Sequence, residues 1–258
     1  MTDIYLDNSS TTQPYPEVIE LTGNVQLKLY GNPSSMHLKG LDAERLIREA
    51  RRGIGSLFGR PENEIIFTSG GTEANNLAIK GAAYRNRRRG NHLVTSSIEH
   101  PSVLHCFRYL EGENFTVDYI DVDGEGRIDL EALRQAVTAD TLIVSIMHVN
   151  NEIGTVQPLA EIGAIIKSIN PKSIFHVDAV QSLGRLPINV DQWHADLVTG
   201  SAHKLHGPKG AGCLWVRSGI LLQPLMQGGE QENGLRPGTE NVPALAGFGL
   251  AAKLTLDD

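Results

Sequence analysis

The sequence lacks several features that mark secreted and membrane proteins. It has only two cysteines, Cys106 and Cys213, which lie far apart in unlike contexts and do not suggest a disulfide framework. No apolar run reaches the ~18 residues that are needed to cross a bilayer. The first seven residues have neither the basic region nor the apolar core of a signal peptide. We therefore expect a reducing, cytoplasmic setting and no contact with a membrane.

Basic charge is also scarce. Lysine and arginine together number 23 against 30 aspartate and glutamate residues, which gives a formal net charge of −7. Non-specific binding of nucleic acid depends on neutralising phosphates with basic groups, so nucleic acid is not an expected partner. The basic run at residues 85–89 follows a predicted helix and is interpreted as a solvated helix end that the helix dipole favours. The prediction includes no metal ion.

The composition is otherwise that of a globular protein. The 258 residues are 40% hydrophobic and 21% charged, which excludes a disordered chain. Many of the 27 glycines lie at junctions between apolar runs and polar turns. Glycine at such places lets the backbone turn sharply or approach a ligand closely.

Short β-rich runs alternate with amphipathic helices along the chain. The predicted strands are residues 64–68, 92–96, 116–121, 141–147, 173–177, 197–201 and 212–216. The predicted helices are residues 40–58, 72–83, 102–110, 129–136, 159–168 and 243–256. Apolar residues almost fill the run 142–147, as expected where helices cover both faces of a parallel sheet. The pattern predicts an α/β fold, an open, mostly parallel seven-stranded sheet with helices on both faces, at residues 36–258. Residues 1–35 are predicted to be an extended, turn-rich segment.

Ligands of open α/β sheets bind outside the carboxyl ends of the strands, so polar residues at those ends are the candidates for a site. Gly71 and Thr72 follow a predicted strand and open a helix. Backbone amides, the Thr72 hydroxyl and the helix dipole could hold a phosphate there. The alternative is a tight turn in which Thr72 caps the helix.

Two charged residues follow other predicted strands. Asp178 ends an apolar strand, so its carboxylate needs a cationic partner, either a protonated ring nitrogen or a structural ion pair. Lys204 lies among small residues, and a desolvated lysine forms Schiff bases with aldehydes. Its alternative is a surface lysine in a glycine-rich loop. Ser201 and His203 beside it could donate to a phosphate.

His100 and Asn151 complete the set of candidates. His100 directly precedes a proline at a helix start, where it could stack on a flat ring, move protons near neutral pH, or be structural. The amides of Asn150 and Asn151 could reach a ring hydroxyl or serve only the turn. A phosphate cup, a carboxylate for a pyridine nitrogen, a lysine for an aldehyde and a stacking imidazole are together the contacts that pyridoxal phosphate needs.

Eight motifs occur in order along essentially the whole chain. They begin at Tyr5 (YLDNSSTT), Gly31 (GNPSSMH), Ser69 (SGGTEANN), Glu99 (EHPS), His148 (HVNNEIG), His176 (HVDAVQS), Ser201 (SAHK) and Gly228 (GGEQENGLRPGTEN). They resemble the NifS/IscS-type cysteine desulfurases, pyridoxal-phosphate enzymes of fold type I in the class V aminotransferase group. The motif from Gly228 is similar to this branch in particular.

The resemblance implies a role for each residue around the ring of pyridoxal 5'-phosphate. Lys204 would carry the cofactor as a Schiff base and move protons at the substrate carbons. His100 would lie over the ring and assist, and Asp178 would pair with the pyridinium nitrogen. Gln181 and Asn151 would lie near the phenolic oxygen and the substrate.

The resemblance also implies how the phosphate is held. Gly71, Thr72, Ser201 and His203 would contact it within one subunit. In the family, the threonine that corresponds to Thr239 reaches the phosphate of the other subunit. This implies a homodimer with shared sites.

The activity implied by the resemblance is the conversion of L-cysteine to L-alanine, with sulfur passed to an acceptor or scaffold protein for iron–sulfur cluster or thio-cofactor assembly. Family members carry the nucleophilic cysteine and the substrate-binding arginine in a small C-terminal domain, which is expected to be absent here. Cys106 and Cys213 are expected to be buried core residues rather than nucleophiles. We therefore expect a cofactor-binding large domain without the sulfur-transfer step. The alternatives are a non-catalytic remnant or sulfur-assembly partner, a selenocysteine lyase, and a class V transaminase.

Overall fold

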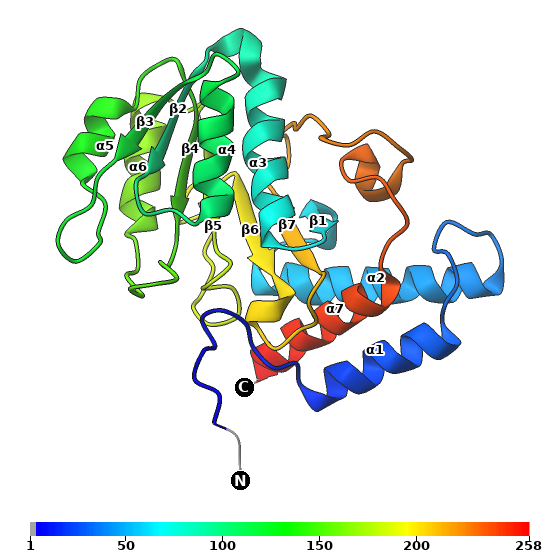
Figure 1. Cartoon of the computed structure of the whole chain (residues 1–258). Helices are drawn as coiled ribbons and strands as arrows, with labels where there is room; N and C mark the ends of the chain where they lie inside the picture. The colour runs from blue at the N-terminus through cyan, green and yellow to red at the C-terminus, as the bar shows by residue number, and fades with distance from the viewer. Residues whose placement is uncertain (1–3, 258) are drawn as a thin grey trace.

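The computed structural model describes residues 4–257 (Figure 1). The helices are α1 Pro16–Lys28, α2 Leu38–Leu57, α3 Gly71–Asn86, α4 Pro101–Glu111, α5 Leu130–Ala136, α6 Leu159–Ile169 and α7 Val242–Asp257. The strands are β1 Ile65–Thr68, β2 His92–Ser96, β3 Thr116–Ile120, β4 Thr141–Met147, β5 Ile174–Asp178, β6 Leu197–Ser201 and β7 Gly212–Val216. Each strand lies within a residue or two of its predicted bounds.

The strands form one seven-stranded sheet in the order β1-β7-β6-β5-β4-β2-β3. All neighbouring strands are parallel except at β7, which runs antiparallel to both β1 and β6. Every residue of the central strands β4, β5 and β6 is buried. The predicted open, mostly parallel sheet is therefore confirmed.

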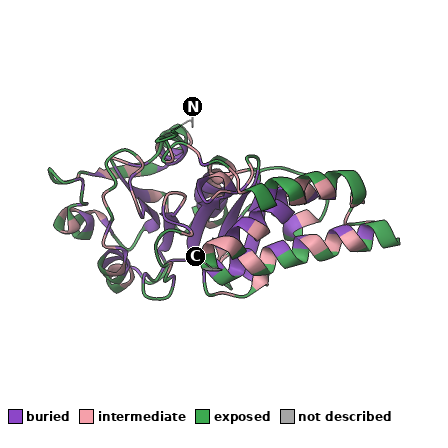
Figure 2. Ribbon diagram, turned by 90° about the horizontal axis from the view of Figure 1, so that it is seen from below, coloured by how far each residue is buried: buried purple, intermediate pink, exposed green. Residues whose placement is uncertain are grey.

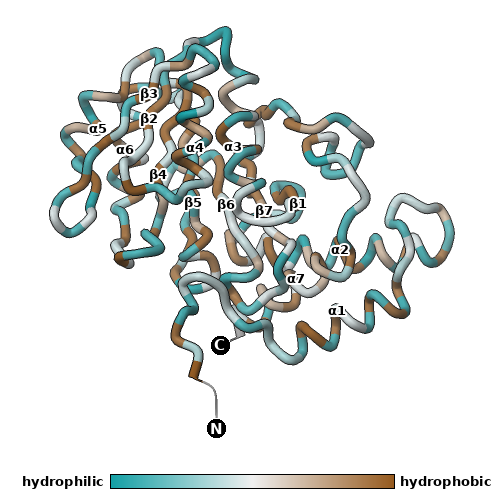
Figure 3. The backbone as a smooth tube through the Cα atoms, viewed as in Figure 1, coloured by the Kyte–Doolittle hydropathy of each residue, from teal (hydrophilic) through white to brown (hydrophobic). Residues whose placement is uncertain are grey.

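Helices cover both faces of the sheet and divide the core in two. On one face, α3 and α4 pack over a cluster that includes Ile66, Leu77 and Phe107. On the other, α2 and α7 enclose a cluster that includes Ile65 and Phe67. Neighbouring residues of β1 thus enter opposite clusters, as the alternation of side chains along a strand requires. Figure 3 shows the hydrophobic residues concentrated along the central strands.

The segment expected to be extended at residues 1–35 contains a helix, α1, which corrects that prediction. The helix begins with Pro16 in its first turn, a favoured place for proline. Only Val18 and Val25, seven residues apart and so on one face, are fully buried. The helix packs along α7, and most of its surface is exposed (Figure 2). Because its apolar stripe is narrow, contact with α7 rather than sequence periodicity decides its structure.

No helix described within residues 4–257 combines the length and the hydropathy that a membrane span requires.

Candidate functional site

A cavity of about 460 Å³ opens at the carboxyl ends of the central strands. Nine of the ten predicted site residues line it: Gly71, Thr72, His100, Asn151, Asp178, Gln181, Ser201, His203 and Lys204. The sheet brings them together because β4, β5 and β6 end side by side. Met147 at the end of β4 pairs with Asp178, and Asp178 pairs with Thr199 of β6. This is the place where open α/β sheets bind ligands.

Lys204 follows β6 on a short 3-10 turn, and only 9% of its surface is exposed. Its Nζ donates to the backbone carbonyl of Ser10 at 2.8 Å and also to that of Ser9. Burial lowers the pKa of Lys204, and the nearby guanidinium of Arg185 lowers it further, although Asp178 and Asp7 act in the opposite direction. A lysine whose pKa is lowered offers more neutral amine, the form that attacks an aldehyde.

Asp178 ends β5 with 5% of its surface exposed. One carboxylate oxygen accepts from the backbone amide of Val180 at 2.9 Å, and the other accepts from Asn75 Nδ2 at 2.7 Å. Burial raises the pKa of Asp178, while these hydrogen bonds and the charges of His100 and Lys204 favour its ionised form. Within residues 4–257 its carboxylate forms no ion pair. A cationic ligand group in the cavity would supply one.

The N-terminus of α3, with Gly71 and Thr72, lies beside Ser201 on one side of the cavity, and these residues form the cup expected to hold a phosphate. A Cβ on Gly71, in the first turn of this helix, would lie 2.7 Å from Val180 Cγ2, so a larger residue would force the Val180 side chain to shift. Ser201 at the end of β6 is 1% exposed, and its Oγ has no partner among the described residues. A buried hydroxyl without a partner is costly, and here it lies beside the free backbone amides of a helix start. The arrangement fits an anion.

The remaining predicted residues lie around the same cavity. His100 caps α4, and its Nδ1 accepts from the Ser102 amide at 3.1 Å. Gln181 Nε2 donates to the Ser9 carbonyl at 2.9 Å, and Asn151 Nδ2 donates to Glu152 Oε1 at 2.7 Å. His203 contacts Thr11 Oγ1 at 3.1 Å, and burial lowers its pKa, with Lys204 and Lys209 adding to the effect.

Asn75 is a lining residue that the sequence prediction missed. It is buried on α3 and donates to Asp178 at 2.7 Å and to Ser102 Oγ at 2.9 Å. The sequence pattern could have predicted Asn75 as a lining residue, because it lies four residues after Gly71 and therefore on the same face of the helix. A buried asparagine among alanines and leucines is a departure from the usual content of a helix interior.

Glu99 is a second missed residue, next to the cavity rather than in its lining. It is 4% exposed, and its Oε1 accepts from Ser96 Oγ at 2.6 Å and from the Met147 amide at 2.8 Å. Its Oε2 has no partner among residues 4–257. Burial, with a smaller contribution from the charge of Asp178, raises the pKa of Glu99 to about 8, although the hydrogen bonds from Ser96 and Met147 act in the opposite direction. The raised pKa favours the protonated form of this side chain at neutral pH.

Three other predicted residues lie away from the cavity. Cys106 and Cys213 are free and buried, as expected, and burial raises the pKa of Cys106 to about 11 and that of Cys213 higher still. Thr239 is exposed and lines a separate hollow of about 140 Å³ with Ser69, Arg236 and others. No group of three or more histidine, cysteine, aspartate or glutamate residues suited to a metal ion occurs in the described part of the chain.

Comparison with known proteins places this geometry in a family. Residues 4–257 match the family described as aminotransferase class-V. The chain is 47% identical to "Cysteine desulfurase IscS 1" of Archaeoglobus fulgidus over 251 residues, covering 97% of this chain and 65% of the relative. It is also 47% identical to "Cysteine desulfurase IscS" of Methanosarcina thermophila over 251 residues, again covering 97% of this chain but 62% of the relative. The chain thus spans a little under two thirds of the length of these relatives.

Solved structures agree with the sequence relatives. A NifS-like protein superposes with a TM-score of 0.96 at 39% identity, covering 99% of this chain and 70% of the other. A structure described as SspA in complex with cysteine superposes with a TM-score of 0.93 at 40% identity, covering 97% and 72%. Class V aminotransferases and cysteine desulfurases depend on pyridoxal phosphate. The chain therefore belongs to the aminotransferase class-V family, among its NifS-like and IscS-type cysteine desulfurase members.

Proposed function

We propose that the chain is the cofactor-binding part of a cysteine desulfurase, an enzyme that converts L-cysteine to L-alanine and passes the sulfur to an acceptor protein. One observation carries the proposal. The amine of Lys204, the carboxylate of Asp178 and the unpartnered hydroxyl of Ser201 all line one cavity of about 460 Å³. That volume falls within the ~300–1,000 Å³ typical of ligand sites.

The residues present fit pyridoxal 5'-phosphate. The cofactor carries an anionic phosphate, a basic ring nitrogen and an aldehyde, and the cavity offers a matching group for each. The orphaned Ser201 Oγ and the space beside Gly71, which a Cβ would fill, suit the phosphate. Asp178, buried and without an ion pair in the described chain, suits the ring nitrogen.

Within this proposal Lys204 holds the aldehyde carbon and Asp178 pairs with the protonated ring nitrogen. Gly71, Thr72, Ser201 and His203, which all line the cavity, hold the phosphate. When bound, the cofactor supplies a carbonyl that condenses with amines and an electron-withdrawing ring.

The chain's own side chains then orient the reactants and move protons. Asp178 would favour a protonated ring nitrogen, and the hydrogen bonds from Asn75 and the Val180 amide favour its ionised form against the effect of burial. Lys204, with its lowered pKa, takes up and releases a proton near the substrate carbons. His100, Gln181 and Asn151 line the cavity. His100 would assist the proton movement beside the ring, and Gln181 and Asn151 would orient the substrate.

We propose that neither cysteine of this chain receives the sulfur. Cys106 and Cys213 are buried, and the raised pKa of each thiol keeps it protonated. Only the thiolate attacks sulfur efficiently, and it needs access to the substrate. Sulfide release from L-cysteine by this chain alone is therefore expected to stay near background, and robust release that disappears in Cys106→Ala would contradict this.

We propose in addition that the protein is a cytoplasmic homodimer that delivers sulfur to an acceptor or scaffold protein. Thr239 supports the dimer because it is exposed and lies in a hollow apart from the cavity of its own chain. In a dimer it would serve the phosphate of the second copy. A monomer in sedimentation that binds the cofactor with unchanged affinity after Thr239→Ala would overturn the shared site.

Trapping of the lysine–cofactor bond tests the main proposal. Wild-type protein incubated with pyridoxal phosphate should develop a visible absorbance band, and borohydride reduction followed by peptide mapping should find the pyridoxyl group on Lys204. Lys204→Ala should show neither signal, while Lys253→Ala, an exposed lysine of α7, should show both. A colourless wild type, or a label at another lysine, would refute the assignment.

A further inference from the structure

The loop at residues 228–241 lies against the segment that leads into the phosphate cup. This segment comprises β1, the turn at residues 69–70 and the start of α3. The loop has little regular structure, and Glu232 and Asn233 within it adopt positive φ values of 49° and 58°. Non-glycine residues take up such a conformation only where surrounding contacts hold them. Two sets of contacts hold this loop against neighbouring elements.

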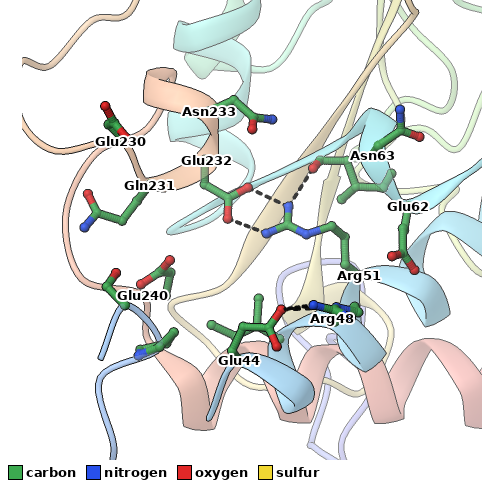
Figure 4. A pocket seen from close by; sticks show the side chains of 14 residues that line it. Glu44, Arg48, Arg51, Glu62, Asn63, Glu230, Gln231, Glu232, Asn233 and Glu240 are labelled. Carbon is green, nitrogen blue, oxygen red and sulfur yellow. Dashed lines mark hydrogen bonds and ion pairs between the residues drawn. The ribbon is translucent and has the colours of Figure 1, made fainter. Parts of the chain in front are cut away.

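The first contact joins the loop to β1. Arg51 of α2 donates to both oxygens of Glu232 at 2.6 Å, as Figure 4 shows. The same two side chains also bond to the backbone of β1. Arg51 donates to the Ile65 carbonyl at 2.7 Å, and Glu232 accepts from the Phe67 amide at 2.8 Å. β1 is the edge strand of the sheet, so a further strand does not pair with its outer backbone groups. The Arg51–Glu232 ion pair supplies hydrogen bonds to two of these groups instead.

This first contact is buried and bidentate. The Glu232 side chain is 2% exposed, and the Arg51 guanidinium lies 4.5 Å from the centre of the Phe67 ring. A bidentate arginine–carboxylate pair fixes orientation as well as distance. By contrast, Arg48 and Glu44, one helical turn away in the same hollow, form a pair that is largely exposed (Figure 4).

The second contact joins the loop to the other end of the segment. Arg236 Nε donates to Glu73 Oε1 at 2.8 Å, and Glu73 Oε2 accepts from the Ser69 amide at 2.7 Å. Glu73 lies in the first turn of α3, and Ser69 precedes the two glycines of the cup. Through Glu73, Arg236 therefore holds the turn on which the backbone amides of the cup depend.

We propose that the loop at residues 228–241 positions the phosphate cup, with Arg51 and Glu232 acting through β1 and Arg236 and Glu73 acting through the turn before α3. None of the four side chains lines the main cavity, although Glu73 lines an adjoining hollow together with Gly71, Thr72 and Ser201. Arg51, Glu232 and Arg236 line neither, so they act on the ligand through the groups that they hold. This inference rests on the proposed binding of pyridoxal phosphate. It predicts that the four residues matter for the phosphate part of the cofactor and not for its ring.

Comparing pyridoxal phosphate with pyridoxal, which lacks the phosphate, separates positioning from general stability. The variants are Arg51→Lys, the double variant Arg51→Met with Glu232→Gln, and Arg236→Met. The double variant removes both charges together, because Arg51→Met alone leaves a buried carboxylate unpaired. Arg236→Met disturbs a pair that is only partly buried, so it preserves the fold. Arg48→Met is the matched control.

The affinity for pyridoxal phosphate, measured by absorbance titration, is expected to fall on the order of tenfold in the double variant and less in the other two. The affinity for pyridoxal should stay unchanged in all of them, and Arg48→Met should change neither affinity. Equal weakening of both ligands, or no weakening of either, would overturn the inference while leaving the proposed function intact. A wild type that does not bind pyridoxal phosphate would overturn both.

Discussion

Two hollows of the described chain are almost equal in volume, about 480 and 460 Å³, yet their polar groups are used differently. In the hollow beside α2, the two arginines are already paired, Arg51 with Glu232 and Arg48 with Glu44. In the cavity at the strand ends, Ser201 has no partner in the described chain and Asp178 has hydrogen bonds but no ion pair. Volume therefore does not distinguish a ligand site from a structural hollow here. The hollow beside α2 also holds an unpartnered buried atom, Glu240 Oε2. The cavity at the strand ends differs because an amine, a carboxylate without an ion pair and an unpartnered hydroxyl, those of Lys204, Asp178 and Ser201, meet in one place.

The largest effect is expected from Asp178→Asn. The substitution keeps the shape of the side chain but removes the buried carboxylate that we propose pairs with the ring nitrogen. We expect pyridoxal phosphate to bind about a hundredfold more weakly, as happens when one partner of a buried ion pair is removed. Absorbance titration with pyridoxal phosphate measures this. The corresponding change in the other hollow, Glu44→Gln, should leave the affinity for pyridoxal phosphate unchanged. An equal loss of affinity in Glu44→Gln would contradict the assignment of the ligand site to the strand ends.

A smaller effect, with opposite signs for stability and binding, is expected from Ser201→Ala. The substitution removes one hydrogen bond to the phosphate, so the affinity should fall about three- to tenfold. The cofactor-free protein should be as stable as the wild type or more so, because an unpartnered buried hydroxyl is removed. Thermal unfolding with and without pyridoxal phosphate separates the two effects.

Ser145→Ala is the matched control for Ser201. Ser145 is equally buried, but its hydroxyl contacts His176 Nδ1 at 2.8 Å in the middle of the sheet. Its loss should lower the stability of the cofactor-free protein and leave the affinity unchanged. If the two serine variants behaved alike, the hydroxyl of Ser201 would not be reserved for a ligand.

The smallest effect concerns Glu99 and pH. Because the pKa of Glu99 is raised from 4.5 to about 8, the folded protein keeps a proton there that the unfolded chain loses above pH 4.5. The contribution of Glu99 to stability is therefore fully present below pH 4.5 and is lost as the pH rises to about 8. Glu99→Gln carries no such proton and should remove this part of the pH dependence. The Tm of Glu99→Gln relative to that of the wild type should therefore rise across that window.

The comparison variant for this experiment is Glu73→Gln. Hydrogen bonds to Arg236 and Ser69 outweigh burial and lower the pKa of Glu73, so its contribution has the opposite sign and is lost as the pH falls. A wild type and a Glu99→Gln variant whose Tm values run parallel from pH 4.5 to 8 would show that Glu99 is ionised throughout.

Local patterns in the sequence were enough to predict most of the sheet. The apolar run of β4 and the strand ends at Asp178 and Ser201 are short-range features, and each survives in the structure. The same patterns missed α1, because only Val18 and Val25 of that helix are fully buried. They also missed Asn75, whose partner Asp178 lies 103 residues away.

The sequence by itself determined which residues end the strands, since burial of a parallel strand demands an apolar run and the first polar residue after it marks the carboxyl edge. Only the tertiary structure decided which polar groups are satisfied. Arg51 and Glu232, 181 residues apart, form an ion pair. Lys204 donates hydrogen bonds to the carbonyls of Ser9 and Ser10, which lie 194 residues or more away in the sequence. Hydrogen bonds between distant residues depend on how the sheet and helices close around them. No local propensity encodes that closure, and it is what leaves Ser201 and Asp178 open to a ligand.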